Sequence, residues 1–426
     1  METGWQAMVS QQKLELYIHI PFCVRKCRYC DFLSMPANED TRRKYVDRLL
    51  EEIRQQGLAC RGYQVVSVFV GGGTPSLLAG VQIWEIMEAV RSYFSLERDA
   101  EITIECNPGT LTAEKLSFYK SAGINRLSLG LQSADDRELR ELGRIHTYRE
   151  FLESFDLARK MGFDNVNVDL MSGLPGQKVQ DWANTLKKVL ALVPEHISAY
   201  SLIVEEGTPF FEAYGEDELR RQRGEEPYML PTEEAEREMY DITLEMLKSR
   251  GYLRYEISNY ALPCRECRHN IGYWQLTPYL GLGLGSSSFM GNARFSNKRQ
   301  LSAYMNEDFC HLPEIMGNGE SYQVMPESYT GEKLQAYCEQ EKVDAAVCYL
   351  DKKQQMEEFM FLGLRMTEGI SRERFQQKFH MTLESVYGAV LQRLQQQGLL
   401  EFHEGIVRLT EAGIGVSNYV FCEFIS

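Results

Sequence analysis

Apolar residues recur along roughly the first 250 residues in two alternating patterns. Short β-rich runs are separated by longer stretches whose apolar positions repeat with a helical period. The short runs predict strands at residues 16–20, 65–70, 101–106, 126–131, 165–170 and 196–202. The longer stretches predict helices near residues 40–56, 81–93, 112 onward, 132–161, 179–192 and 232–251.

Helix-end signals support these assignments. Thr112 and Thr232 stand where an N-cap hydroxyl is expected, just before a helical pattern begins. Three glutamates fill the first turn after Thr232, where acidic groups complement the helix dipole. Gly251 follows the same helix and predicts its end.

Six strand–helix units in a row predict an α/β fold with a parallel sheet and right-handed crossovers. Six units are fewer than the eight of a closed barrel, so a partial (β/α)6 barrel fits, with a doubly wound sheet as the alternative. Both folds collect functional groups at the carboxyl ends of their strands. Polar and glycine-rich motifs do follow the predicted strands: a cysteine loop, GGGTP, Glu105, Gln132 and Asp169.

The pattern changes after about residue 252. A glycine-rich stretch at 279–297 predicts loops and short strands, and the chain from about residue 332 reads as mostly helical. Its last part predicts two helices and then a short hairpin, which is a winged-helix-like order. We therefore divide the chain into a barrel (1–251), a connecting segment (252–310) and a mainly helical, winged-helix-like C-terminal domain (311–426) that serves for packing or interaction.

Composition narrows the class of protein. Of 426 residues, 44% are hydrophobic and 25% charged, which is typical of a soluble globular chain. The net charge of -15 disfavours a nucleic acid partner, although a local basic patch stays possible. No apolar run approaches a membrane span and no secretory signal precedes the barrel, so we expect a cytoplasmic protein with at most peripheral membrane association. The chain has 11 cysteines, an odd number, and no secretory signal, which disfavours a framework of disulfide bonds.

Three cysteines stand together in CVRKCRYC, directly after the first predicted strand. Cys23, Cys27 and Cys30 are spaced C-x3-C-x2-C. Three thiolates on one loop suit a [4Fe-4S] cluster whose fourth iron has no protein ligand. A zinc site expects paired C-x2-C units and a fourth ligand, and His19 is too close in sequence to complete a tetrahedron easily. Structural cysteines without a metal are the third interpretation.

The cysteine spacing, with Tyr29 before the last cysteine, resembles the signature of the radical S-adenosylmethionine (SAM) superfamily. Eight further stretches are similar to the HemN/HemW group within it: YIHIPFC, VFVGGGTPSLL, ITIECNPGTLT, INRLSLGLQS, LGRIHT, VNVDLMSGLPGQ, HISAYSLIVEEGTP and HNIGYW. That group includes an oxygen-independent coproporphyrinogen III dehydrogenase and a heme chaperone. The resemblance implies a partial (β/α)6 barrel and a [4Fe-4S] cluster whose open iron binds SAM.

The resemblance also implies a set of SAM contacts at the ends of successive strands. They are Tyr17, Gly72, Gly73, Thr74, Glu105, Gln132, Arg144 and Asp169. Glycine permits close backbone approach to a ligand, and arginine suits a carboxylate. Taken singly, each has a structural alternative: a glycine triplet is often a turn, Asp169 could cap a helix, and Arg144 and His146 could lie on a helix surface.

Two features separate the members of this group. The resemblance implies that the dehydrogenase has a further cysteine two places after the third, whereas this chain has Phe32, as the chaperone does. The resemblance also assigns heme binding to His269, Tyr273 and Trp274 of RHNIGYW. A neutral imidazole can ligate heme iron, and the two aromatic rings offer flat apolar faces.

Three points complicate the heme assignment. Without the resemblance, His269 would be read as a turn cap and its aromatic neighbours as core residues. Cys264 and Cys267 form a second C-x2-C pair, but it lacks enough nearby ligands for a metal site. Ser287 stands where chaperone-like chains often have histidine, so the heme ligand set can differ here.

We therefore expect a heme chaperone that carries a [4Fe-4S] cluster and SAM, binds heme and passes it to acceptor proteins. An electron donor is the other expected partner. The alternative is oxygen-independent coproporphyrinogen III dehydrogenase, a radical SAM decarboxylase of porphyrin biosynthesis, which Phe32 disfavours. A radical SAM enzyme that acts on nucleic acid is a third possibility, disfavoured by the acidic charge. Whether the chain is an enzyme stays open, and no catalytic residue is assigned.

Overall fold

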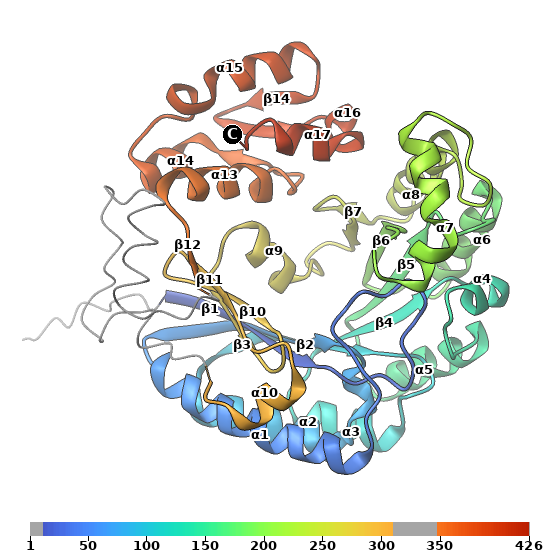
Figure 1. Cartoon of the computed structure of the whole chain (residues 1–426), viewed down its shortest axis with the longest axis vertical. Coiled ribbons are helices and arrows are strands. Elements are labelled where there is room, and N and C mark those ends of the chain that lie inside the picture. Colours follow the sequence, from blue (N-terminus) through green and yellow to red (C-terminus); the bar gives the residue numbers. More distant parts are fainter. Residues whose placement is uncertain (1–11, 310–346, 426) are drawn as a thin grey trace, which may run out of the picture.

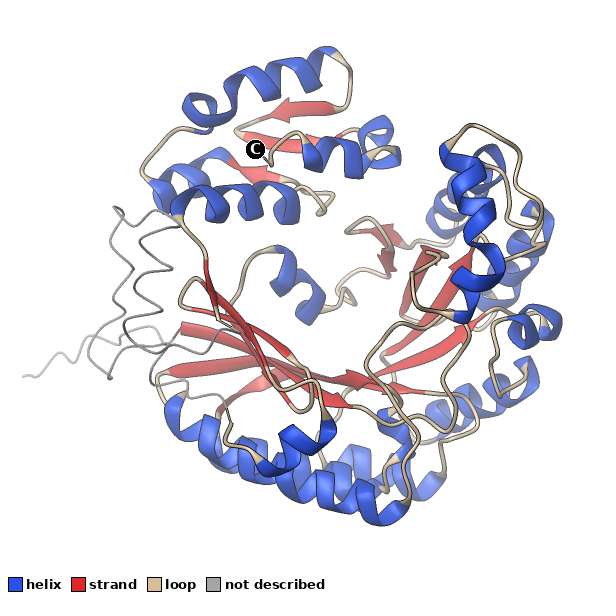
Figure 2. Ribbon diagram, in the orientation of Figure 1, coloured by secondary structure: helices blue, strands red, loops and turns tan. Residues whose placement is uncertain are grey.

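The computed structural model describes residues 12–309 and 347–425. These residues build a curved sheet with helices along its outer face, and a smaller C-terminal domain on the open side of the curve (Figures 1 and 2). The expected boundary between residues 310 and 311 lies outside the described residues. So does the part of the expected helical region from 332 to 346.

Six parallel strands in chain order form the middle of the sheet. They are β1 (Gln12–Ile20), β2 (Tyr63–Gly72), β3 (Ser95–Cys106), β4 (Arg126–Gln132), β5 (Val166–Ser172) and β6 (His196–Ser201). Each strand pairs in parallel with the next one along the chain. This order confirms the partial barrel and excludes the doubly wound sheet, in which the strand order reverses at a switch point.

Helices connect these strands and cover the outer face (Figure 1). They are α1 (Glu39–Ala59), the short helix η1 (Pro75–Leu77), α2 (Gly80–Tyr93), α3 (Ala113–Ser121), α4 (Asp136–Glu141), α5 (Tyr148–Lys160), α6 (Val179–Leu190), α7 (Pro209–Gln222) and α8 (Glu233–Lys248). Both predicted N-caps are confirmed, since the hydroxyls of Thr112 and Thr232 accept from backbone N–H groups three residues on. Gly251 takes a φ of 84° just beyond α8.

Two details differ from the sequence-based expectation. The helical region expected up to residue 161 is interrupted between α4 and α5, because Gly143 at φ 74° ends α4. The interruption places Arg144 in a loop that faces the sheet edge. Helix α7 had no sequence-based prediction, although it begins with Pro209 and is capped by Thr208.

The sheet continues beyond both ends of the six-stranded unit. Next to β1 lie β9 (Tyr279–Leu282), β10 (Ser287–Met290), β11 (Ala293–Ser296) and β12 (Cys348–Tyr349), while β8 (Asn259–Ala261) and β7 (Leu253–Arg254) extend the other end from β6. Strand β9 is parallel to β1, whereas β8 is antiparallel to β6. The connecting segment also forms α9 (Arg268–Trp274), inside the curve of the sheet (Figure 1), and α10 (Leu301–Asn306).

The C-terminal domain has its own apolar core. It consists of α13 (Lys352–Gly363), β13 (Ile370–Ser371), α14 (Arg372–Phe379), α15 (Leu383–Gln396), β14 (Leu400–His403), β15 (Ile406–Leu409), α16 (Glu411–Gly415) and α17 (Ser417–Cys422). Helices α14 and α15 followed by the β14–β15 hairpin confirm the winged-helix-like order. Ion pairs Arg254–Glu411 and Arg294–Glu358 join this domain to the connecting segment. None of the helices described in either domain is long and apolar enough to span a membrane.

Candidate functional site

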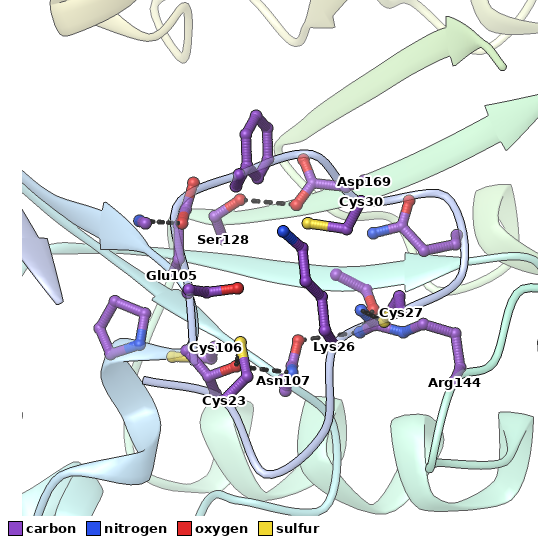
Figure 3. Close-up of a pocket in the computed structure, with 18 of the residues that line it drawn as sticks. Cys23, Lys26, Cys27, Cys30, Glu105, Cys106, Asn107, Ser128, Arg144 and Asp169 are labelled. Atoms are coloured by element: carbon purple, nitrogen blue, oxygen red, sulfur yellow. Dashed lines mark hydrogen bonds between the residues drawn. The ribbon is translucent and has the colours of Figure 1, made fainter. Parts of the chain in front are cut away.

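The three clustered cysteines line one cavity at the carboxyl ends of the strands (Figure 3). Seven of the eight predicted SAM contacts line the same cavity: Gly72, Gly73, Thr74, Glu105, Gln132, Arg144 and Asp169. They come from the ends of four neighbouring parallel strands and the loops that follow them. The eighth, Tyr17, lies outside this cavity. The parallel sheet thus gathers residues that are up to about 150 positions apart in sequence.

The cysteine loop is held in place from both sides. Cys23 donates its backbone N–H to the carbonyl of Met35 at 3.1 Å, and Arg28 donates its N–H to the carbonyl of Leu142 at 3.1 Å. The Arg28 guanidinium also pairs with Glu141 at 2.7 Å. The loop therefore has a defined conformation set by the barrel, which orders the cysteines before any cluster binds.

Side chains form hydrogen bonds with two of the three sulfurs. Thr74 Oγ1 lies 3.3 Å from Cys23 Sγ, and Arg144 Nη1 donates to Cys27 Sγ at 3.6 Å. Burial raises the pKa of the Cys30 thiol to about 11, so iron binding has to displace its proton. Hydrogen-bond donors aimed at cysteine sulfur are a feature of iron–sulfur sites, where they tune the cluster.

The donor set fits a cluster better than a single ion. Among the described residues, no three or more His, Cys, Asp or Glu side chains converge as they would around one metal ion. A cubane places its irons apart, so its cysteines need not point at a common centre. The cavity supplies three thiols from one loop and hydrogen-bond donors to two of them.

The glycine loop after β2 is packed tightly against the cysteine loop. Gly72 has a φ of 113°, and a Cβ there would lie 2.6 Å from the ring of His19. A Cβ on Gly73 would lie 2.8 Å from the carbonyl oxygen of Phe22, next to Cys23. Both positions require glycine, because a side chain would push against β1 at Gly72 and against the cysteine loop at Gly73.

Two carboxyl groups form the floor of the cavity. Glu105 accepts from the N–H of Gly72 at 3.0 Å, and Asp169 accepts from the hydroxyl of Ser128 at 3.0 Å. Burial, with the nearby Asp169 adding to it, raises the pKa of Glu105 to about 8. Burial also raises the pKa of Asp169. These acceptors suit hydroxyl donors such as those of a ribose.

The cavity lining also holds a buried free acceptor on Gln132 and two polar residues that the sequence did not single out, Asn107 and Ser128. The Oε1 atom of Gln132 is buried without a hydrogen-bond partner among the described residues, and its backbone takes a φ of 72°. Asn107 and Ser128 also line the cavity. Asn107 follows β3 in the NPG sequence, so the strand-end rule could have found it. Ser128, inside β4, has no such signal.

A second cavity of ≈ 480 Å³ adjoins the first and shares Phe32, Gly72 and Glu105 with it. Tyr17 lies here, with its hydroxyl 3.0 Å from Nδ1 of His19. Its remaining lining includes His19, Tyr273, Tyr279, Ser286, Ser287 and Arg299. Aromatic rings, hydroxyls and one guanidinium thus surround a space beside the cysteine loop.

Helix α9 carries the predicted heme residues but does not bring all three together. His269 is 1% exposed, with Nδ1 2.8 Å from Ser67 Oγ and Nε2 2.9 Å from the Tyr273 hydroxyl. Ser67 donates its own proton to Glu15, so Nδ1 carries a proton and Nε2 accepts from Tyr273. Burial lowers the pKa of His269 to about 3, which keeps the ring neutral.

Trp274, at the end of α9, faces the C-terminal domain instead. Its ring lies 4.3 Å from the Arg365 guanidinium carbon. At the start of α9, the Glu101 carboxylate accepts the N–H groups of Arg268 and His269 at 3.1 and 3.2 Å and the Cys267 thiol at 3.4 Å. Cys267 is buried, whereas Cys264 is exposed. Of this C-x2-C pair, only Cys267 therefore contacts the Glu101 carboxylate that holds the start of α9.

Comparison with known proteins agrees with this geometry. Residues 17–189 match the Radical SAM superfamily, a range that holds the three cysteines of the loop after β1 and the eight predicted SAM contacts, and residues 350–416 match the HemN C-terminal domain. "Heme chaperone HemW" of Bacillus subtilis is 34% identical over 410 residues, covering 96% of this chain and 98% of the relative. This chain belongs to the HemW group of the radical SAM superfamily.

Other members and a solved structure extend the comparison. The HemW of Escherichia coli is 39% identical over 295 residues, covering 69% of this chain and 74% of that protein. A bovine mitochondrial protein, "Radical S-adenosyl methionine domain-containing protein 1", is 32% identical over 98% of this chain and 88% of its own length. The structure of coproporphyrinogen III oxidase (HemN) from Escherichia coli has the same fold, with a TM-score of 0.75 at 23% identity over 97% of this chain and 90% of that one.

Membership in this superfamily implies SAM and a [4Fe-4S] cluster as cofactors, as expected from the cysteine motif. In this HemW member, Phe32 is 65% exposed and lies where the two cavities meet. Ser287 lies in the second cavity, where it offers a hydroxyl group. The roles of the individual site residues stay predictions.

Proposed function

We propose that this protein is a heme chaperone that carries a [4Fe-4S] cluster and SAM, binds heme and delivers it to acceptor proteins. The observation that carries the proposal is the similarity to the Bacillus subtilis heme chaperone along 96% of the chain. Phe32, in place of a further cysteine beside the cluster loop, supports it over an oxidative decarboxylase. The proposal includes an electron donor as partner and a cytoplasmic location.

In this proposal Cys23, Cys27 and Cys30 hold the cluster, which supplies an open iron for SAM and one-electron reduction. The glycine loop would pass its backbone along the SAM amino acid moiety, and Arg144 would pair with the SAM carboxylate. Glu105 and Asp169 would accept the ribose hydroxyls. The buried free acceptor on Gln132 supports a polar ligand in this cavity, since such an atom is costly to leave unpaired.

Heme binding would use the second cavity together with α9. Tyr273 lines this cavity, and its hydroxyl occupies the lone pair of the neutral His269 Nε2. Ligation of heme iron by His269 therefore requires Tyr273 to move away. Arg299, exposed on the cavity wall, would pair with a heme carboxylate. Trp274, which contacts Arg365, would reach the heme only if α9 and the C-terminal domain rearranged.

Hemin titration of anaerobically reconstituted protein tests the proposal. We expect a saturable Soret change in the wild type and in His403→Ala, because His403 is an exposed histidine of the C-terminal hairpin. The change should be lost or shifted in His269→Ala. A second step mixes the heme-loaded protein with an apo-heme protein and follows transfer spectroscopically.

Two outcomes would count against the chaperone function. One is the absence of any saturable heme spectrum in cluster-loaded wild type. The other is formation of protoporphyrinogen IX from coproporphyrinogen III in an anaerobic assay with SAM and reductant, which would establish the dehydrogenase instead. Cleavage of SAM without that product would leave the chaperone proposal standing.

A further inference from the structure

Asn107 connects two of the proposed cluster cysteines through hydrogen bonds, although it is not among the predicted SAM contacts. It follows β3, two residues after Glu105, and its side chain lies in the cavity between Cys23 and Arg144 (Figure 3). Asn107 Nδ2 donates to Thr74 Oγ1 at 3.0 Å, and Arg144 Nη2 donates to Asn107 Oδ1 at 2.8 Å.

These contacts complete a chain from one cysteine to another. Thr74 Oγ1 lies 3.3 Å from Cys23 Sγ, and Arg144 Nη1 lies 3.6 Å from Cys27 Sγ. The order is therefore Cys23, Thr74, Asn107, Arg144 and Cys27. Thr74 is 3% exposed, so its hydroxyl does not exchange partners freely with solvent.

The direction of every hydrogen bond in this chain follows from donor chemistry. A guanidinium only donates, so Arg144 must face the amide oxygen of Asn107 rather than its nitrogen. The amide nitrogen then donates to Thr74, whose single hydroxyl proton is left free for Cys23. A cysteine sulfur bound to iron carries no proton and can only accept. Asn107 thus orients the Thr74 hydroxyl as a donor to that sulfur.

The backbone around Asn107 is held firmly enough for this role. Its N–H donates to Ser76 Oγ at 3.1 Å, and its carbonyl accepts from the Thr110 N–H at 3.2 Å and the Thr110 hydroxyl at 2.7 Å. Arg144 is fixed by a further bond to the carbonyl of Gly130 at 2.7 Å. Contacts within the protein therefore hold both Asn107 and Arg144 in position.

We infer that Asn107 is a positioning residue that sets the reduction potential of the cluster by holding Thr74 and Arg144 as donors to two of its cysteine sulfurs. Hydrogen bonds to cluster sulfur favour the reduced, more negative state and raise the potential. The inference rests on the proposed function, because it requires the cluster to bind at these cysteines.

Three variants test it, with Asn107→Asp as the conservative one. Aspartate keeps an acceptor for Arg144 but offers Thr74 a second acceptor in place of a donor, so the Thr74 proton turns away from Cys23. Asn107→Leu removes both contacts without adding charge, and Thr74→Val removes only the hydroxyl. The readouts are iron and sulfide content, the electron paramagnetic resonance spectrum, and the midpoint potential from a redox titration.

We expect all three variants to lower the ratio of reduced to oxidised cluster at a fixed potential. The expected change is about threefold to tenfold, where tenfold corresponds to about 59 mV for a one-electron couple. Because Asn107 acts partly through Thr74, Asn107→Leu should shift the potential less in a Thr74→Val background than in the wild type. Asn184→Asp adds the same charge on α6, beyond the cavity lining, and should leave the potential unchanged.

Each other result would overturn the inference. An unchanged potential in Asn107→Leu and Asn107→Asp, with full cluster content, would show that Asn107 does not act on the cluster. Equal shifts in both backgrounds would show that it does not act through Thr74. Loss of the cluster from both variants, with unchanged unfolding of the cluster-free protein, would make Asn107 an assembly residue rather than a tuning one. Failure of the wild type to bind any cluster would instead reject the proposed function.

Discussion

The variant Tyr273→Phe removes one hydroxyl group and tests whether His269 Nε2 can ligate heme iron or serves only as a hydrogen-bond partner of Tyr273. The Tyr273 hydroxyl lies 2.9 Å from His269 Nε2, to which it donates in the tautomer inferred from Ser67, and His269 is 1% exposed. The variant keeps the ring and its packing against Tyr279, whose centroid lies 4.6 Å away. It leaves the Nε2 lone pair buried without a partner.

The magnitude follows from that unsatisfied acceptor. A buried acceptor left without its donor costs about 1–3 kcal/mol, so the heme-free variant should lose about that much stability. Iron ligation by Nε2 would satisfy the atom again and recover this free energy. Heme should therefore bind about 5-fold to 150-fold more tightly to Tyr273→Phe than to the wild type. The two effects have one cause, so their free energies should agree.

Two measurements on the same preparations check this. Urea unfolding of the heme-free protein gives the stability change, and hemin titration followed at the Soret band gives the affinity. Tyr279→Phe is the matched control, because Tyr279 lines the same cavity but accepts from Arg294 at 3.0 Å rather than contacting His269. We expect little change in heme affinity in that control.

Two results would contradict this prediction. If Tyr273→Phe loses stability while its heme affinity stays at the wild-type value, the freed lone pair does not reach iron. His269 would then be a structural residue of α9. If the affinity falls instead, the Tyr273 hydroxyl itself contacts the heme.

Three further predictions concern the barrel. Glu101→Gln should weaken the docking of α9 by about 2 kcal/mol, because a charged acceptor of two helix N–H groups is lost. Hydrogen exchange at residues 268–274 should therefore accelerate. The control Glu114→Gln, which changes an exposed first-turn acid on α3, should leave that exchange rate unchanged. SAM should bind more tightly as the pH rises through about 8, because the raised pKa of Glu105 keeps its carboxyl protonated below that pH. Isothermal titration calorimetry should find that SAM affinity depends less on pH in Glu105→Gln. An equally steep pH dependence in the variant would show that a group other than Glu105 titrates. Gly73→Ala should reduce iron content, because its Cβ would lie 2.8 Å from the carbonyl of Phe22; full occupancy would show that the loops can separate.

How much of the site the sequence could predict depends on the kind of interaction. Residues that work through local spacing or through a strand end were found, as Cys23, Cys27, Cys30 and Glu105 show. Tyr17, predicted as a SAM contact, lines the adjoining cavity, where its ring stacks against Phe69 with the centroids 6.4 Å apart. The sequence pattern does not specify this neighbour.

The sequence by itself determined the open barrel and the place of its chemistry. A series of strand–helix units has few ways to pack, and parallel strands present their carboxyl ends on one edge. Only the tertiary structure decided which atoms face one another: Asn107 between Thr74 and Arg144, and the Nε2 of His269 against Tyr273. The direction of a hydrogen bond depends on both partners, and no periodicity in one segment specifies the atom that a distant segment presents to it.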